Sequence, residues 1–215
     1  MCGIAGIFGY SAITQEVDHD CLSRMTEAMV PRGPDGSGVW ISKNKRVGFG
    51  HRRLSIIDLS EGGAQPMVLD NGRLAITFNG EIYNFRELRA DLKATGHIFK
   101  TCSDTEVLLH LYDRYGHAMV ERIRGMFALA IHDRERGGVF LARDGFGIKP
   151  LYYTDDGKSI RFASQVKALL AGGGLDTSPS AAGHAGFYVW GYVPEPWTMF
   201  KNIHALPAGS TLWIN

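Results

Sequence analysis

A cysteine stands at position 2, directly after Met1. Methionine is normally trimmed when the next residue is small, so we expect Cys2 to become the first residue of the mature chain. The ordinary pKa values of an α-amine and a thiol lie close together, and a free amine beside a thiol can act as its base. A cysteine also reaches position 2 by chance. Residues 3–8, however, predict a buried strand that would hold the sulfur still, so Cys2 is our candidate nucleophile.

A second candidate site is the segment FNGEIYN, which contains Asn79, Gly80 and Glu81. The apolar residues 74–78 predict a strand that delivers a turn to the end of a sheet. There the side-chain amide of Asn79 and a main-chain N–H could face one oxyanion. The alternative is a plain hairpin turn, for which Asn-Gly is the commonest signal.

Two further charged residues could hold a free amino acid at its α-carbon. Arg53 could bind a carboxylate through two parallel hydrogen bonds, which a lysine could not reproduce. Asp104 could accept hydrogen bonds from an ammonium, although an acid in the first turn of a helix is also favoured by the helix dipole. We interpret Arg52 as a solvated charge. His51 either orients Arg53 or is a structural histidine with satisfied hydrogen bonds.

The segment GGGLDTS, residues 172–178, superficially resembles the pyrophosphate-binding loop of ATP pyrophosphatases. Such a loop needs a buried strand before it and a helix that starts within it. Here a helical stretch precedes the segment and Pro179 follows it, so we predict a plain loop. The eight histidines show no HExxH or paired-ligand spacing, so we expect no metal site.

The elements that must position these residues follow from apolar periodicity and capping patterns. Strands are predicted over 3–8, 37–41, 46–50, 73–79, 126–132, 138–142, 151–153 and 160–163. Helices are predicted over 18–30, from Asn84 (paired with Glu87) to Gly96, from Ser103 (paired with Glu106) to Gly116, and over 164–171 and 181–190. This order has no regular βαβ alternation, which favours an α+β fold of antiparallel sheets covered by helices.

Composition excludes several classes of function. The 215 residues include 23 Lys and Arg against 22 Asp and Glu, so no strong field favours nucleic acid or an acidic membrane. No apolar run approaches the roughly 20 residues of a membrane span, and the N-terminus does not resemble a secretory signal. The three cysteines have no CxxC spacing and cannot all pair, which favours a reduced, cytoplasmic setting.

Several long motifs, in order and at matching spacing, resemble the class II glutamine amidotransferases. Within that class the chain is most similar to the glutaminase half of glutamine-dependent asparagine synthetase. The motifs are MCGIAGIFG, RGPDG, GHRRLSIIDLS, GAQPM, FNGEIYNF, SDTEVLLHLY, GMFALAIHD, LARDGFGIKPLYY and GYVPEPWTMFKNIHALPAGSTLW. The resemblance covers residues 1–215 and implies a single glutaminase domain. It also implies a four-layer αββα sandwich of the N-terminal nucleophile hydrolase type.

The resemblance implies a role for each candidate residue. Cys2 would attack the side-chain amide carbon of glutamine and release ammonia through a thioester, and Asn79 and the Gly80 amide would form the oxyanion hole. The resemblance assigns the α-carboxylate to Arg53 and the α-ammonium to Glu81 and Asp104. It gives a positioning role near the nucleophile to Arg32. The family often has histidine before RGPD, where this chain has Pro31, which would alter the loop near the site and not the chemistry.

Asparagine synthetase also needs a second domain that adenylates aspartate with ATP and magnesium, and this chain ends before one could start. We therefore expect an excised or truncated N-terminal domain that needs no cofactor and makes glutamate and ammonia but not asparagine. Its partners would be L-glutamine and a synthetase domain, and a homodimer of the full-length enzyme is left open. Family members that amidate sugar phosphates or phosphoribosyl pyrophosphate fit the SDTE and GFGIKPLYY segments less well.

Two alternatives stay open at this point. The same domain could serve another carboxylate acceptor, such as a sugar acid or a natural product, because acceptor choice lies outside this sequence. The domain could also be a catalytically silent module that binds glutamine or a partner. The second case would hold if Met1 were retained, because a retained methionine acylates the amine that serves as the base.

Overall fold

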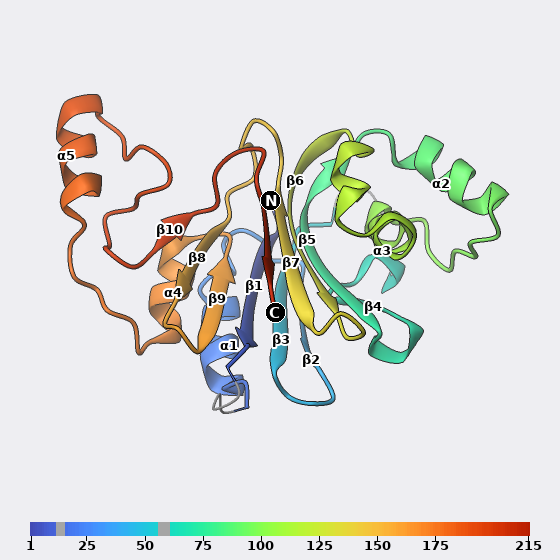
Figure 1. Cartoon of the computed structure of the whole chain (residues 1–215), viewed down its shortest axis with the longest axis horizontal. Helices are drawn as coiled ribbons and strands as arrows, with labels where there is room; N and C mark the ends of the chain where they lie inside the picture. The colour runs from blue at the N-terminus through green and yellow to red at the C-terminus, as the bar shows by residue number, and fades with distance from the viewer. Residues whose placement is uncertain (12–15, 56–60) are drawn as a thin grey trace.

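Two antiparallel sheets pack face to face in the computed structural model, which describes residues 1–11, 16–55 and 61–215 (Figure 1). Within these residues the first sheet has six strands in the order β10-β8-β9-β1-β3-β2. They span His204–Ala205, Tyr152–Asp155, Ser159–Ala163, Gly3–Gly9, Val47–Arg53 and Gly36–Ile41. The second sheet, counted over the same ranges, has five strands in the order β11-β7-β6-β5-β4. They span Thr211–Ile214, Gly138–Arg143, Gly125–Asp133, Leu74–Ile82 and Met67–Leu69.

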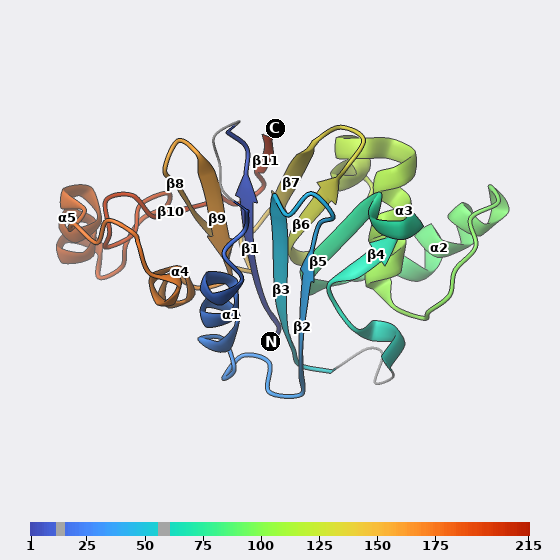
Figure 2. The ribbon, with the colours of Figure 1, turned by 90° about the horizontal axis from the view of Figure 1, so that it is seen from below.

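Helices cover the outer faces of both sheets. The helices α1 (His19–Glu27) and α4 (Val166–Gly172) pack on the six-stranded sheet, and α2 (Phe85–Ala94) and α3 (Asp104–Tyr115) lie on the five-stranded sheet (Figures 1 and 2). The helix α5 (Ala181–Trp190) projects beyond the edge of the sandwich. Short 3-10 turns occupy Glu61–Gly63, Asp70–Gly72 and Gly116–Glu121. The predicted four-layer αββα sandwich, and with it the α+β class, is confirmed.

The strand β1 explains how the start of the chain is held in the fold. All seven of its residues are buried, and it pairs with β3 on one edge and β9 on the other. Successive side chains point to opposite faces of a sheet. Ile4 and Phe8 accordingly pack between the sheets, while Ala5 and Ile7 belong to the apolar cluster that includes α1. Cys2 is therefore carried by a strand that is fixed on both edges and both faces.

The Asn79-Gly80 pair does not form the predicted turn. The strand β5 continues through it to Ile82, with Asn79 opposite Ala128 and Gly80 opposite Phe127 of β6. A Cβ atom on residue 80 would lie 2.2 Å from the Met126 carbonyl oxygen, so only glycine allows the two strands this close approach. The turn prediction, and with it the plain hairpin alternative, is wrong because cross-strand pairing outweighs the local turn preference.

Helix α2 begins at the predicted place, but the predicted cap is wrong. The Asn84 side chain accepts a hydrogen bond from the Arg124 main-chain N–H at 2.9 Å and donates one to the Arg122 carbonyl at 3.0 Å. No side-chain capping bond to α2 is made by Asn84. Glu87, the second residue of the predicted capping pair, forms an ion pair with Arg124. The side chain of Asn84 thus joins α2 to the segment before β6.

Helix α3 is capped by only half of the predicted box. The Ser103 hydroxyl accepts from the Thr105 N–H at 3.1 Å, as an N-cap serine should. The Glu106 carboxylate does not reach back to Ser103 but accepts from the main-chain N–H groups of Lys100 and Thr101 at 2.8 and 2.7 Å. Glu106 therefore fixes the loop that leads into α3.

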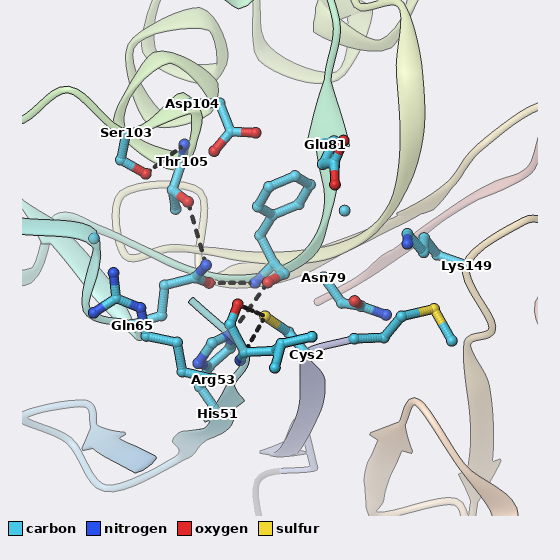
Figure 3. Close-up of a pocket in the computed structure, with 15 residues that line it drawn as sticks. Cys2, His51, Arg53, Gln65, Asn79, Glu81, Ser103, Asp104, Thr105 and Lys149 are labelled. Carbon is cyan, nitrogen blue, oxygen red and sulfur yellow. Dashed lines mark hydrogen bonds between the residues drawn. The ribbon is translucent and has the colours of Figure 1, made fainter. Parts of the chain in front are cut away.

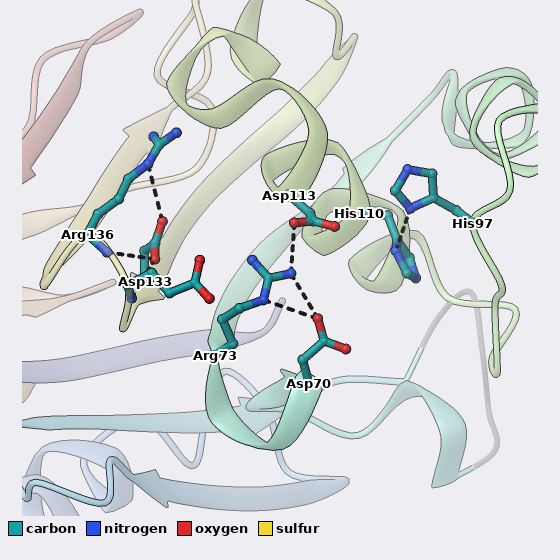
Figure 4. A network of polar contacts seen from close by, with 8 residues as sticks. Asp70, Arg73, His97, His110, Asp113, Asp133 and Arg136 are labelled. Atoms are coloured by element: carbon teal, nitrogen blue, oxygen red, sulfur yellow. Dashed lines mark hydrogen bonds and ion pairs between the residues drawn. The ribbon is translucent and has the colours of Figure 1, made fainter.

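A polar network holds the other end of α3 against the five-stranded sheet (Figure 4). The Arg73 guanidinium bonds Asp70 at 2.9 Å and Asp113 of α3 at 2.7 Å. Nearby, Nδ1 of His97 and Nδ1 of His110 lie 3.1 Å apart. Together with the loop contacts of Glu106, these bonds fix the helix whose N-terminus carries Asp104.

Candidate active site

One pocket gathers the ends of β1, β3 and β5 and the N-terminus of α3 (Figure 3). Every predicted site residue except Arg32 lines it. Its lining consists of Met1, Cys2, His51, Arg53, Leu54, Gly63, Gln65, Phe78, Asn79, Gly80, Glu81, Ser103, Asp104, Thr105 and Lys149. Predicted site residues that lie more than 100 positions apart in the sequence, such as Cys2 and Asp104, are thus brought to one place, although their roles stay predictions.

The Cys2 sulfur is held by the main chain of Leu54, just after β3. The Leu54 N–H donates to Sγ at 3.4 Å, and Sγ lies 3.5 Å from the Leu54 carbonyl oxygen, to which the thiol can donate. After loss of the thiol proton only the N–H contact remains favourable, and it would stabilise the thiolate.

Arg32 lies in the turn after α1 and contacts the nucleophile segment from outside the pocket. Its Nε donates to the Cys2 carbonyl oxygen at 3.0 Å. The Arg32 carbonyl oxygen in turn accepts from the α-amino group of Met1 at 3.1 Å. These bonds position the main chain on both sides of residue 2 and leave the Cys2 side chain facing the pocket.

Asn79 presents an unsatisfied donor beside Cys2. Its side chain is 1% exposed, and Nδ2 has no hydrogen-bond partner among the residues that the structure describes. Figure 3 shows this amide in the pocket near Cys2, and Gly80 lines the same pocket. A buried donor without a partner costs about 1–3 kcal/mol, so such a group calls for a ligand or a functional reason.

Acidic groups gather at the opposite end of the pocket from Arg53 (Figure 3). Asp104 is 5% exposed and its Oδ2 accepts from the Ile82 N–H at 3.2 Å. Burial raises the pKa of Asp104 to about 6, main-chain hydrogen bonds oppose this shift, and the charge of Glu81 adds to it. An ammonium beside Asp104 would offset the cost of ionising its buried carboxyl.

The raised pKa of Asp104 predicts a stability gain on its replacement. The folded protein keeps this proton up to a pH of about 6, while the unfolded chain loses it near 3.8, so wild-type stability falls as the pH rises between these values. Asp104→Asn should raise the free energy of unfolding at pH 8, by ~3 kcal/mol at most, and leave it unchanged at pH 3. Urea denaturation at both pH values measures this, with Asp91→Asn on the exposed face of α2 as control. An equal effect of Asp104→Asn at both pH values would contradict the assignment.

Arg52 is not the solvated charge that we predicted. Its side chain is 11% exposed, pairs with Glu27 at 3.3 Å and donates to the Gly33 carbonyl oxygen at 3.2 Å. His51, which is 1% exposed, has its Nε2 3.3 Å from the Phe78 carbonyl oxygen. His51 therefore bonds to the strand β5, in agreement with the structural alternative stated for it.

Sequence reasoning missed several polar residues of the pocket, among them Gln65 and Lys149. Gln65 belongs to the motif GAQPM, but no spacing indicated which groups its amide would bond. Its Oε1 accepts from the Phe78 N–H at 2.6 Å, and its Nε2 donates to the Thr105 hydroxyl at 3.2 Å. Lys149 belongs to GFGIKPLYY and is 6% exposed, where a lysine would ordinarily be expected in solvent. Both motifs contributed to the resemblance without pointing to these side chains.

The segment that superficially resembles a pyrophosphate-binding loop follows a helix and not a buried strand. The helix α4 ends at Gly172, and the residues after it up to Ser178 form the predicted loop, in which the Asp176 carboxylate accepts from the Ser178 N–H at 2.9 Å. Among residues 1–11, 16–55 and 61–215 no cluster of three or more His, Cys, Asp or Glu could hold a metal ion. No helix in these ranges is long and apolar enough to cross a membrane.

Comparison with known proteins decides the family. The model of the glutamine amidotransferase domain matches residues 1–215. The chain belongs to this family. As a glutamine amidotransferase domain, it is 40% identical over 216 residues to asparagine synthetase (glutamine-hydrolyzing) 1 of Bacillus subtilis, covering all of this chain and 33% of that protein. It is 46% identical over 172 residues to asparagine synthetase (glutamine-hydrolyzing) 2 of the same organism, covering 80% of this chain and 22% of that protein.

Further relatives extend this picture. Amidase chry2 of Gibberella zeae is 40% identical over 152 residues, which cover 71% of the amidotransferase domain and 22% of that protein. The glutamine phosphoribosylpyrophosphate amidotransferase of Bacillus subtilis, solved with ADP and GMP, superposes with a TM-score of 0.67 at 25% identity, covering 80% of this chain and 44% of that one. The allosteric regulatory enzyme of purine biosynthesis has a TM-score of 0.73 at 23% identity over 100% and 47% of the two chains, which shows the fold alone. The domain thus spans a third or less of the length of the three sequence relatives.

Proposed function

We propose that this domain hydrolyses the side-chain amide of L-glutamine to glutamate and ammonia through a thioester on Cys2. We further propose that the ammonia serves an ATP-dependent synthetase domain, most closely that of asparagine synthetase. One observation carries the proposal: the buried Nδ2 of Asn79, which has no hydrogen-bond partner among the described residues, belongs to the same pocket as the Cys2 thiol. The donor and the nucleophile are what a reaction through a tetrahedral oxyanion requires.

The chemistry begins after Met1 is removed and the α-amine of Cys2 is free. This amine takes the thiol proton, and Sγ attacks the amide carbon of glutamine. The oxyanion that forms receives hydrogen bonds from Asn79 Nδ2 and the Gly80 N–H. As the C–N bond breaks, the α-ammonium returns its proton to the leaving nitrogen, which departs as ammonia. Water then attacks the thioester while the amine takes its proton. The C–S bond breaks, the α-ammonium returns the proton to the sulfur, and glutamate is released.

The pocket has complementary charges for a free amino acid at its two ends. Arg53 would bind the α-carboxylate, while Asp104 and Glu81 would bind the α-ammonium. Since the pKa of Asp104 is about 6, its carboxyl is largely ionised at pH 7–8 and can accept from the ammonium. A substrate without these two groups would lose both sets of contacts.

Arg53→Ala tests the function together with the orientation of the substrate. The trimmed wild-type protein should release glutamate and ammonia in equal amounts from glutamine. The variant should raise the KM for glutamine about 10- to 100-fold, the value of one or two charged hydrogen bonds, with little change in kcat. The KM for 4-aminobutanamide, which lacks the carboxylate, should change far less.

The exposed Arg86 on α2 provides a matched control, because Arg86→Ala removes an arginine outside the pocket. Equal effects of Arg53→Ala on both substrates would mean that Arg53 is structural. No glutamate release from trimmed wild-type protein would refute the glutaminase itself.

One alternative acceptor has an observation in its favour. The similarity extends to a protein named as an amidase as well as to asparagine synthetases. The same ammonia-producing domain would then serve another carboxylate acceptor. Assay of the complete gene product with aspartate, ATP and glutamine distinguishes the two, because only the first proposal yields asparagine.

A silent binding module is the remaining alternative. The α-nitrogen of Met1 bonds to Arg32, and Met1 lines the pocket. With Met1 attached, the nitrogen of Cys2 is an amide and cannot serve as a base. The intact mass of protein isolated from its native cell decides between the two proposals, since complete retention of Met1 would exclude catalysis.

The three cysteines are unpaired in the structure, and we place the activity in the cytoplasm, where they would stay reduced.

A further inference from the structure

The strand β5 extends past the end of its neighbour β4 before it reaches Asn79. The strand β4 pairs only with Leu74, Ala75 and Ile76, whereas β5 continues to Ile82. Buried main-chain N–H and C=O groups need partners, and beyond Ile76 the strand β4 no longer supplies them. At Phe78 both groups bond to side chains: the N–H donates to Gln65 and the carbonyl faces His51. Two side chains thus take the place of a neighbouring strand.

The Gln65 amide has a single orientation in this arrangement. A main-chain N–H can only donate, so Oε1 must face Phe78, at 2.6 Å. This leaves Nε2 to donate to the Thr105 hydroxyl at 3.2 Å in the first turn of α3. Figure 3 shows the bond from Gln65 to Thr105. Although Gln65 lines the pocket, its oxygen and one of its N–H groups are used within the protein.

His51 fixes the other main-chain group of Phe78. Burial lowers the pKa of His51 to about 4, so the imidazole is neutral at pH 7. Because a carbonyl oxygen can only accept, Nε2 must carry the proton that it shares with Phe78. The Thr77 hydroxyl adds a bond to the Gly50 carbonyl oxygen at 3.2 Å. The strand β5 is therefore fastened to β3 of the facing sheet immediately before Asn79.

We propose that Gln65 is a positioning residue for the oxyanion donor, with His51 as its counterpart. The pair holds the peptide groups of Phe78 and thereby fixes the next residue, Asn79. Through Thr105, Gln65 also sets the distance between Asn79 and the N-terminus of α3, where Asp104 would hold the substrate ammonium. This inference rests on the proposed glutaminase function.

The test replaces Gln65 by methionine, which has similar length and no hydrogen-bonding amide. A misplacement of about 1 Å at a catalytic group can cost about 100-fold, so we expect kcat for glutamine to fall about 10- to 100-fold. KM should change less than about threefold, because the proposed substrate-binding charges remain. Alkylation of Cys2 by iodoacetamide, which needs no oxyanion donor, should proceed at the wild-type rate.

A double-mutant cycle shows whether Gln65 acts through Asn79. In the Asn79→Ala background the donor is absent, so Gln65→Met should cost less than about threefold more. If Gln65→Met does not fold, Gln65→Glu replaces it, because the carboxylate still accepts from the Phe78 N–H, whereas the Thr105 hydroxyl must turn from accepting to donating to keep its bond. Its smaller loss in kcat should also vanish in the Asn79→Ala background.

Three results would overturn the inference. A wild-type kcat in the folded Gln65 variants would do so, and so would an equal slowing of iodoacetamide alkylation or full additivity with Asn79→Ala. In each of these cases the wild-type protein still hydrolyses glutamine and the proposed function stands. A wild-type protein that does not hydrolyse glutamine would refute the proposed function, and the inference with it.

Discussion

Cys2→Ala should abolish glutamine hydrolysis while the protein stays folded. Loss of a catalytic nucleophile can cost about 10⁶-fold in kcat, which would bring the rate to background. The fold should persist because the Cys2 side chain is only partly buried and its bonds in the described residues are two weak contacts with the main chain of Leu54. Glutamate release, measured beside the circular dichroism spectrum and the melting temperature, checks both parts.

The chain supplies a matched control for this experiment. Cys102 is an exposed free cysteine outside the pocket lining. Cys102→Ala should keep wild-type kcat and KM, which separates loss of one particular thiol from loss of any thiol. Glutamine hydrolysis above about 1% of the wild-type rate in Cys2→Ala would contradict the thioester mechanism, because the residue that forms the thioester could not be dispensable to that degree.

Asn79→Ala should lower kcat about 100- to 1000-fold, which corresponds to about 2.7–4 kcal/mol of barrier. Nδ2 has no partner among the described residues and would find one only when the oxyanion forms, so its loss should leave KM within a few-fold of wild type. Steady-state kinetics with glutamine measure both constants. The exposed Asn202 provides the control variant Asn202→Ala.

The balance between kcat and KM decides the role of Asn79. A rise in KM with unchanged kcat would mean that its amide binds the ground-state substrate and not the transition state. Unchanged kcat and KM would show that the Asn79 amide has a structural role and takes no part in the reaction. Either result would leave Cys2 without its proposed oxyanion hole.

Most of the fold follows from local patterns in the sequence. The apolar run of β1, the buried strands β6 and β7 and the glycine-ended helix α3 lie close to their predicted bounds. They do so because burial of continuous apolar faces dominates in each case. The predictions failed where a tertiary contact overrides a local preference. The pairing of β5 with β6 straightens the Asn-Gly pair, and the segment before β6 takes up the side chain of Asn84.

The residues of the candidate site, too, could be predicted only in part. The motif resemblance pointed to Cys2, Asn79 and Asp104, and the fold places them in one pocket. Gln65 could not be predicted, since its role depends on where β4 stops pairing with β5, a fact of three-dimensional register. The ion pair of Arg52 with Glu27 could not be predicted either, because it depends on how α1 packs beside β3.

The most direct test of the central claim is peptide mapping after incubation with an electrophilic glutamine analogue, 6-diazo-5-oxo-L-norleucine. The protein must first be shown by intact mass to lack Met1. The account predicts one label per chain, on the peptide that begins with Cys2, slowed by excess glutamine and absent from Cys2→Ala. A label on Cys21, Cys102 or any other residue, or a label that persists in Cys2→Ala, would contradict it.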